Sequence, residues 1–160
     1  MRQAVLDILR NHARTPVSEI ARRLDRSEEE IQRTIDELEK SKTVLGYQAV
    51  VNPEKLDEEP CLGIIEVKIK PERQRGYDAI AEQIYRFPEV KLCYLVSGDY
   101  DVLVFVEGSS LKSVSHFVTE KLATIDNVAG TTTHFILKKF KEFGVAMGGD
   151  ERTERLVVSP

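Results

Sequence analysis

The feature that most constrains this chain is a change of hydrophobic pattern at a charged stretch, residues 53–60, that lies between two prolines. Before this stretch, apolar residues recur every three to four positions, as in amphipathic helices. Beyond it, short runs rich in β-branched residues alternate with helical segments. A proline-bracketed, weakly periodic segment is typical of a linker, and a chain of 160 residues is long enough for two small domains. The predicted parts are a helical domain over 1–52, a linker over 53–60, a mixed domain over 61–144 and a C-terminal tail over 145–160.

The N-terminal third contains three segments with helical periodicity. Pro16 is well placed to open the second of them, and Ser27 and Glu30 form the capping-box pattern that starts the third at Glu28. A segment with alternating apolar residues, Val44 to Val51, follows and predicts a strand. Helix, tight turn, helix and strand is the order of a winged helix-turn-helix, in which the later helix enters the major groove of DNA. A plain three-helix bundle is the alternative interpretation.

The outward face of the predicted third helix is acidic, and carboxylates beside phosphates are repulsive. Glu28, Glu29, Asp36 and Glu37 lie on this face, and residues 1–52 carry nine basic and nine acidic side chains. DNA contact therefore has to come from a local cluster of basic and amide side chains. The carboxylates either accept hydrogen bonds from cytosine amino groups or stabilise the helix dipole, and the second explanation suits the first two better than the later pair. The candidate DNA-binding residues are Arg22, Arg23, Arg26, Gln32, Arg33, Lys40 and Lys42.

Beyond residue 60 the patterns run in the order strand, helix, strand, strand, helix, strand. This order is typical of the ferredoxin-like βαββαβ arrangement, an antiparallel sheet with both helices on one face. Apolar residues fill nearly every position of 92–96 and 102–106, so we expect a second copy of the chain to cover the opposite face. The sequence thus predicts an α+β fold and an obligate dimer. The predicted strands are 62–70, 91–97, 102–107 and 131–141, and the predicted helices are 77–87 and 111–122.

The turn between the two central strands places two carboxylates, a phenol and a glycine backbone in four residues, Gly98-Asp99-Tyr100-Asp101. As a binding site, either aspartate would pair with a ligand ammonium, backbone amides near Gly98 would meet a carboxylate, and Tyr100 would pack over the ligand side chain. The hydroxyls of two further residues on one sheet face, Thr131 and Thr133, would reach the same ligand. The alternatives are a hairpin turn with customary residues and ordinary β-branched strand filling.

Several short motifs together resemble the Lrp/AsnC (feast/famine) regulators, whose C-terminal half is called the RAM domain. The resemblance spans nearly the whole chain. It implies double-stranded DNA as a partner and an amino acid or related metabolite as the effector. It also implies a dimer built through the RAM domains, assembly of dimers into tetramers or octamers, and an effector bound where dimers meet. The motifs are Leu24, Ser27, Arg33 and Leu38-Glu39; Gly46-Tyr47 and Asn52-Pro53; Gly98 to Asp101; and Thr131-Thr132-Thr133 before Phe135-Ile136-Leu137.

Composition excludes several other classes of protein. Basic and acidic side chains number 23 and 27, which argues against a polycation that coats nucleic acid. No apolar run approaches the roughly 20 residues that span a bilayer, and the N-terminus lacks the apolar core of a signal peptide, so we expect a cytoplasmic protein and no membrane partner. Cys61 and Cys93 are then expected as reduced, buried thiols.

No pattern in the chain indicates catalysis, a cofactor or a metal. His12, His116 and His134 are scattered without metal-ligand spacing, and neither a nucleophile motif nor a phosphate-binding loop is present. The chain also resembles the sirohaem decarboxylases, enzymes with the same two-domain architecture. Such an enzyme needs histidine and arginine near the second and third predicted strands to bind propionates and move protons, and residues 92–101 contain neither. A second alternative is a sensor that has lost DNA binding and co-assembles with a paralogue.

Overall fold

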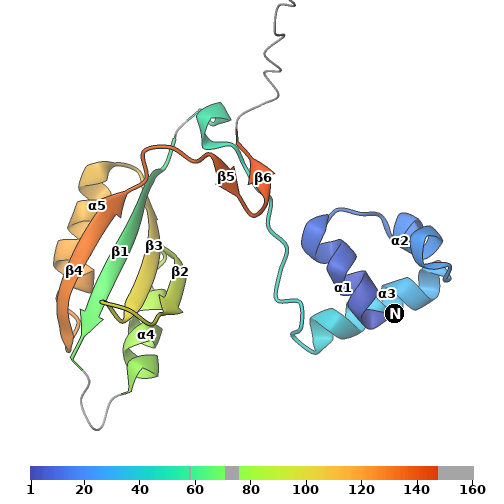
Figure 1. Cartoon of the computed structure of the whole chain (residues 1–160), viewed down its shortest axis with the longest axis horizontal. Coiled ribbons are helices and arrows are strands. Elements are labelled where there is room, and N and C mark those ends of the chain that lie inside the picture. The colour runs from blue at the N-terminus through green and yellow to red at the C-terminus, as the bar shows by residue number, and fades with distance from the viewer. Residues whose placement is uncertain (58, 71–75, 148–160) are drawn as a thin grey trace, which may run out of the picture. The chain divides into compact units, whose positions relative to one another are not determined.

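The computed structural model describes residues 1–57, 59–70 and 76–147. The chain forms two compact units, Met1–Val50 and the remainder from Val51 onward, and each is described by itself (Figure 1). Within the described residues, the longest apolar stretches of helix fall short of what is needed to cross a bilayer.

The first unit consists of three helices packed around a small apolar core. They are α1 (Arg2–Asn11), α2 (Val17–Leu24) and α3 (Glu28–Lys40). Helix α3 starts where predicted, because the Ser27 hydroxyl accepts a hydrogen bond from the Glu30 backbone N–H while the Glu30 carboxylate accepts from the Ser27 backbone N–H. A left-handed residue, Asp25 (φ 53°), ends α2 and makes the turn toward α3. The buried core of this unit is made of Val5, Leu9, Ile20, Ala21, Ile31, Ile35 and Leu38.

The predicted strand over Val44–Val51 is wrong. These residues lie outside any helix or strand, and within the described part of the chain no backbone hydrogen bond joins residues 45–51 to another segment. A strand needs a hydrogen-bonded neighbour, and the helical first unit offers none. The first unit is therefore a helix-turn-helix without the strand wing that the alternating pattern indicated.

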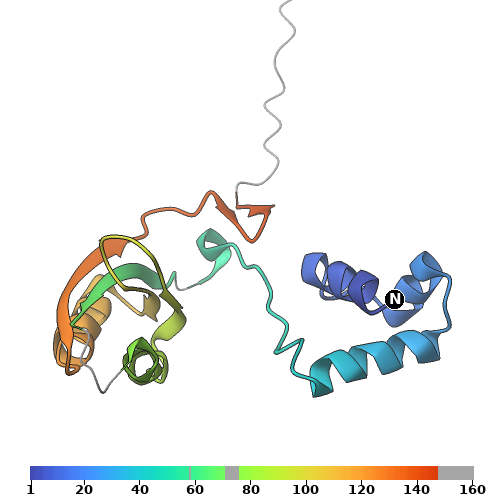
Figure 2. The same cartoon turned by 60° about the horizontal axis from the view of Figure 1, so that its bottom comes forward.

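The second unit has the predicted order of elements. Its sheet is antiparallel with the strand order β2-β3-β1-β4, and two helices lie on the same side of it (Figures 1 and 2). The elements are β1 (Cys61–Ile69), α4 (Tyr77–Tyr85), β2 (Val90–Leu95), β3 (Val102–Gly108), α5 (Leu111–Phe117), a π-helical turn (Val118–Leu122) and β4 (Val128–Phe135).

The two faces of this sheet differ in burial. On β1, Ile65 and Val67 are fully buried against the helices, together with Ile80 and Ile84 of α4 and Val114 of α5. The open face carries apolar residues as well, and in a single chain these are no more than half-buried. They are Leu62 and Ile64 on β1, Leu92 and Tyr94 on β2, and Leu103 and Phe105 on β3. The apolar runs of β2 and β3 thus supply two apolar faces rather than one.

An ion pair fixes the end of the second helical segment to the sheet. Lys121 in the π-helical turn pairs with Glu89, and its ammonium lies 5.6 Å from the ring centre of Phe87 and 5.9 Å from that of Phe117. The hydrogen bond from this ammonium holds the pKa of the Glu89 carboxyl below its ordinary value.

The fourth strand ends earlier than predicted, at Phe135 rather than Lys141. After it, the short hairpin of β5 (Lys141–Glu142) and β6 (Val145–Ala146) turns at Phe143 and Gly144, both of which have positive φ. The carbonyl of buried Met147 accepts a hydrogen bond from the Asn52 side chain, so the last residue of the predicted helical domain packs against a residue of the predicted tail. Residues 148–160, the rest of the predicted tail, lie outside the described residues.

Candidate functional site

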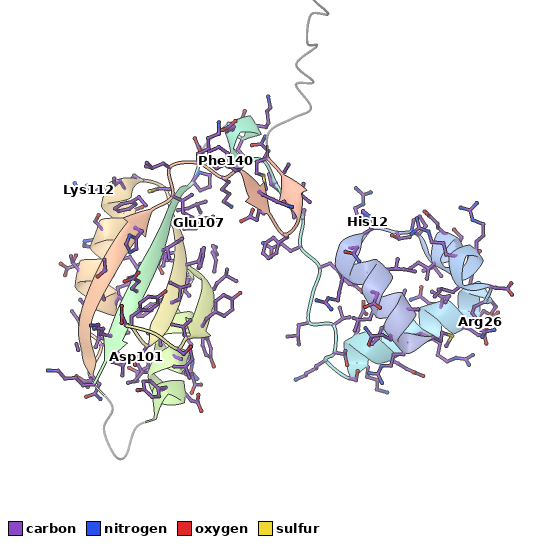
Figure 3. All side chains as sticks on the ribbon, in the orientation of Figure 1. His12, Arg26, Asp101, Glu107, Lys112 and Phe140 are labelled. Atoms are coloured by element: carbon purple, nitrogen blue, oxygen red, sulfur yellow. The ribbon has the colours of Figure 1, made fainter. Side chains whose placement is uncertain are left out.

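The predicted DNA-binding residues lie on α2, on α3 and at the ends of these helices. Arg22 and Arg23 are in the last turn of α2, and Arg26 lies in the turn before α3 (Figure 3). All seven side chains are exposed. The remaining four are Gln32, Arg33 and Lys40 on α3 and Lys42 just beyond it.

These side chains differ in whether a carboxylate already engages them. Arg23 pairs with Glu19 one turn earlier on α2. Within the described residues, the other five cations form no salt bridge; they are Arg22, Arg26, Arg33, Lys40 and Lys42. A cation that forms no ion pair is available to a phosphate at no cost of breaking one, so these five are stronger candidates for contacts with DNA than Arg23.

Several carboxylates of α3 have partners that the sequence analysis did not assign. Asp36 accepts a hydrogen bond from the Gln32 amide at 2.7 Å, and Glu39 accepts one from the Tyr47 hydroxyl at 2.9 Å. Burial, with the bond to Glu39 as a second cause, raises the pKa of Tyr47. The i, i+4 spacing of Gln32 and Asp36 is the signal that could have predicted their contact, because residues four apart are neighbours on a helix.

The Gly98–Asp101 turn is held to the end of β1 by Asp101. Its carboxylate accepts a hydrogen bond from the Ile69 backbone N–H at 2.8 Å, and its own N–H donates to the Val67 carbonyl at 3.0 Å (Figure 3). The Asp101 carbonyl also accepts from Val96 at 2.9 Å, which closes the turn. Asp101 is therefore a structural residue of the turn in this structure.

The other residues of the turn leave polar groups free. Asp99 is exposed, and its carboxylate has no hydrogen-bond partner among the described residues. The backbone N–H groups of Gly98, Asp99 and Tyr100 likewise donate to no group in that part of the chain. Gly98 has φ +153°, a conformation that side chains with a Cβ rarely adopt. A free carboxylate thus lies beside three free backbone donors, the complement of an ammonium and a carboxylate.

Thr131 and Thr133 lie on the far side of β1 from this turn. Val67 pairs with Val102, next to the turn, on one side and with Thr131 on the other. Two strand spacings, about 10 Å, therefore separate the turn from this threonine. Both threonines are half-buried and share a sheet face, as predicted, and it is the helix-covered face, because they pair with buried residues of β1.

The first unit contains a groove at α1, and the second unit contains two thiols. A groove of about 440 Å³ in the first unit is lined by α1 residues including Leu6 and Leu9 and by Val44 to Tyr47.

Burial raises the pKa of the Cys93 thiol, which makes it a poor nucleophile, and neither Cys93 nor Cys61 is in a disulfide. No group of three metal-ligating side chains occurs among the residues described.

Comparison with known proteins assigns this architecture. The sequence profile of the Lrp/AsnC ligand binding domain matches residues 62–146, more than half of the chain. The chain belongs to the Lrp/AsnC family. The uncharacterized HTH-type transcriptional regulator YugG of Bacillus subtilis is 42% identical over 157 residues, which cover 98% of this chain and 95% of that protein. The HTH-type transcriptional regulator LrpA of Pyrococcus horikoshii is 31% identical over 137 residues, 86% of this chain and 94% of its own.

A solved structure of a transcriptional regulator agrees with the fold. A transcriptional regulator from Neisseria meningitidis, in complex with L-methionine, superimposes with a TM-score of 0.71 and 25% identity over 88% of this chain and 90% of that one. The chain is thus a helix-turn-helix transcriptional regulator with a C-terminal ligand-binding domain, as its motifs predicted. It is not an enzyme, so the interpretation as a sirohaem decarboxylase is wrong.

Proposed function

We propose that this Lrp/AsnC regulator reads operator DNA with α3 and its basic neighbours, and that an amino acid bound at the Gly98–Asp101 turn controls how copies assemble. The observation that carries the proposal is the division of roles between the two aspartates. Asp101 holds the turn to β1, whereas Asp99 is exposed and free beside unused backbone donors.

An α-amino acid fits the free groups of this turn. Its ammonium would pair with the Asp99 carboxylate, and its carboxylate would accept hydrogen bonds from the backbone N–H groups of residues 98–100. Tyr100, which is half-buried, would pack over the ligand side chain. The L-methionine in the Neisseria meningitidis structure supports a ligand of this class.

The assembly that we propose begins with a homodimer. The open sheet face carries Leu92, Leu103 and Phe105 in adjacent strands, and a second copy of the same face would remove this apolar surface from water. Dimers would then associate into tetramers or octamers in the cytoplasm. About two strand spacings separate the turn from the threonines of the same chain, and the threonines lie on the helix-covered face. We therefore propose a pocket shared between dimers and not within the paired open faces, with Thr131 and Thr133 from another chain.

Coupling between ligand and DNA follows from population shift. A ligand changes the assembly only by binding one state more tightly than the other, because equal affinity for both states shifts nothing. Dimer-to-octamer assembly changes how many reader helices are linked, and linkage multiplies weak half-site binding. Linking several reader domains thus compensates for the weak attraction of each one to DNA, since its positive and negative charges balance.

The effector site is tested by a matched pair of variants. Thermal unfolding of the full-length protein is measured with each of the twenty proteinogenic amino acids, L-methionine among them, and then with the variants Asp99→Ala and Asp101→Ala. Asp99→Ala is expected to abolish most of the ligand-induced rise in melting temperature, a loss of tenfold or more in affinity, while the ligand-free melting temperature is unchanged.

Asp101→Ala is expected to behave differently, since it leaves the buried Ile69 N–H without an acceptor. The free energy of unfolding should fall by about 1–3 kcal/mol in the absence of any ligand. Equal effects of the two variants on ligand-free stability, or a full ligand response in Asp99→Ala, would contradict the division of roles.

DNA reading is tested by gel shift against a random duplex pool over a salt titration. Lys42→Ala should weaken binding to all duplexes several-fold and reduce the salt slope by about one, because a phosphate contact carries no sequence information. Arg33→Ala should relax sequence preference instead. Lys112→Ala, which changes an exposed side chain on α5 of the other unit (Figure 3), serves as the control with no expected change. A wild-type protein that binds no duplex at low ionic strength would leave the co-assembling sensor without DNA binding as the function.

A further inference from the structure

The pair Gln32 and Asp36 gives α3 a side chain of fixed hydrogen-bonding character. The Gln32 Nε2 donates to Asp36 Oδ1 at 2.7 Å. The amide has this orientation for a physical reason, because the reverse orientation would place its carbonyl oxygen against a carboxylate. The remaining groups of Gln32 are one N–H donor and the Oε1 acceptor, side by side at the end of the amide.

Both residues lie on the side of α3 that faces away from the core of the first unit. The buried face is defined by Ile31, Ile35 and Leu38, with Thr34 between them. At 3.6 residues per turn, Asp36 lies about 150° around the helix from the centre of this face and Gln32 about 110°. Both side chains are exposed, and Asp36 makes no salt bridge within the described residues.

We propose that Gln32 selects adenine in the operator and that Asp36 is its positioning residue. The inference rests on the proposed entry of α3 into the major groove. There adenine presents an acceptor (N7) beside a donor (N6–H), which match the free N–H and Oε1 of Gln32. Guanine presents two acceptors, N7 and O6, so its O6 would face Oε1 of Gln32 without a donor between them, and no N–H donor of the base would lie near the Asp36 charge.

The hydrogen bond between Gln32 and Asp36 also accounts for the presence of the Asp36 carboxylate on a helix face that is proposed to meet DNA. A free glutamine side chain samples several rotamers and loses this freedom on binding, whereas one already bonded to an ionised carboxylate loses less. Asp36 thus weakens general attraction to phosphates and gains discrimination at one base pair. The helix dipole explains Glu28 and Glu29, in the first turn, but it does not reach Asp36.

The experiment selects duplexes from a random pool with the full-length protein and repeats the selection with Gln32→Ala, Asp36→Ala and Glu37→Ala. Glu37→Ala is the matched control, because it removes one negative charge from the same helix and its carboxylate makes no hydrogen bond in the described part of the chain. Circular dichroism and thermal unfolding verify that each variant is folded.

Asp36→Ala and Glu37→Ala each remove one negative charge from α3, so both should bind all duplexes more tightly and to a similar degree. Gln32→Ala should lose about tenfold in preference for adenine at one position of each half-site, and Asp36→Ala should lose part of that preference, whereas Glu37→Ala keeps it. If the wild-type protein selects DNA and Gln32→Ala selects the same sequence, the inference is wrong while DNA reading stands. If the wild-type protein binds no duplex, both are wrong. Equal loss of preference in Asp36→Ala and Glu37→Ala would remove the positioning role.

Discussion

Phe105→Asp is expected to convert the protein into a monomer. Phe105 lies on the open face of the sheet, where it pairs with Ile64 on one side and Leu92 on the other. In the proposed dimer each copy would bury this aspartate against apolar side chains without a partner, at a cost of roughly 3 kcal/mol or more per copy. Two copies together would raise the dimer Kd by about four orders of magnitude. Size-exclusion chromatography with light scattering measures the mass directly.

The matched control is Leu111→Asp, the same change of an apolar residue to aspartate on α5, on the other side of the sheet. Leu111 is 59% exposed at the start of that helix, where a negative charge interacts favourably with the helix dipole. This variant should retain the wild-type mass. A Phe105→Asp variant that keeps the wild-type mass would show that the sheets do not pair, and a monomeric wild-type protein would exclude the dimer altogether.

The sequence predicted the second unit well, because its fold depends on signals that are local and repeated. Strand and helix patterns alternate in an order that fits one common arrangement, and boundaries such as Val102 and Tyr77 agree with the structure. In the first unit, the capping box at Ser27 fixed the start of α3 by a specific pair of hydrogen bonds.

The errors arose where local pattern depends on a partner that the pattern does not reveal. Residues 44–51 alternate as a strand does, but the first unit, to which all of them except Val51 belong, contains no strand to pair with them. The residues after Phe135 continue an apolar run, but β4 can extend only as far as its antiparallel neighbour β1. Because β1 begins at Cys61 and Phe135 pairs with Gly63, few residues of β1 remain to pair beyond Phe135. Strand length was therefore set by the neighbouring strand and not by composition.

The candidate site shows the same division. The sequence placed the Gly98–Asp101 turn and its polar groups correctly between two strands, but it left the roles of Asp99 and Asp101 interchangeable. Their difference depends on the Ile69 N–H, a group 32 residues away from Asp101, which no spacing rule addresses. The residues of the turn were thus predictable and their division into structural and free groups was not.

Gly108→Val is expected to lower the free energy of unfolding of the second unit by about 3 kcal/mol. A Cβ at this position would overlap Ser113 Oγ and lie 2.9 Å from Val114 Cγ2. Ser113 Oγ is part of the capping box that starts α5, since it accepts a hydrogen bond from the Ser110 N–H, while the Ser110 hydroxyl accepts one from the Ser113 N–H. Overpacking of roughly 1–3 kcal/mol therefore adds to the loss of a cap worth about 1 kcal/mol.

The melting temperature of a domain of this size should fall by roughly 12 to 24 °C for such a loss, which differential scanning calorimetry measures. Gly130→Val on β4 is the matched control, because it is the same substitution in a strand of the same sheet and a Cβ there meets nothing within 4 Å. The β-branched residue is favoured in a strand, so this variant should be neutral or slightly more stable. The two sites differ mainly in the steric overlap at Gly108. Equal melting temperatures for the two variants would therefore contradict the view that the close approach of β3 to α5 requires a glycine at this position.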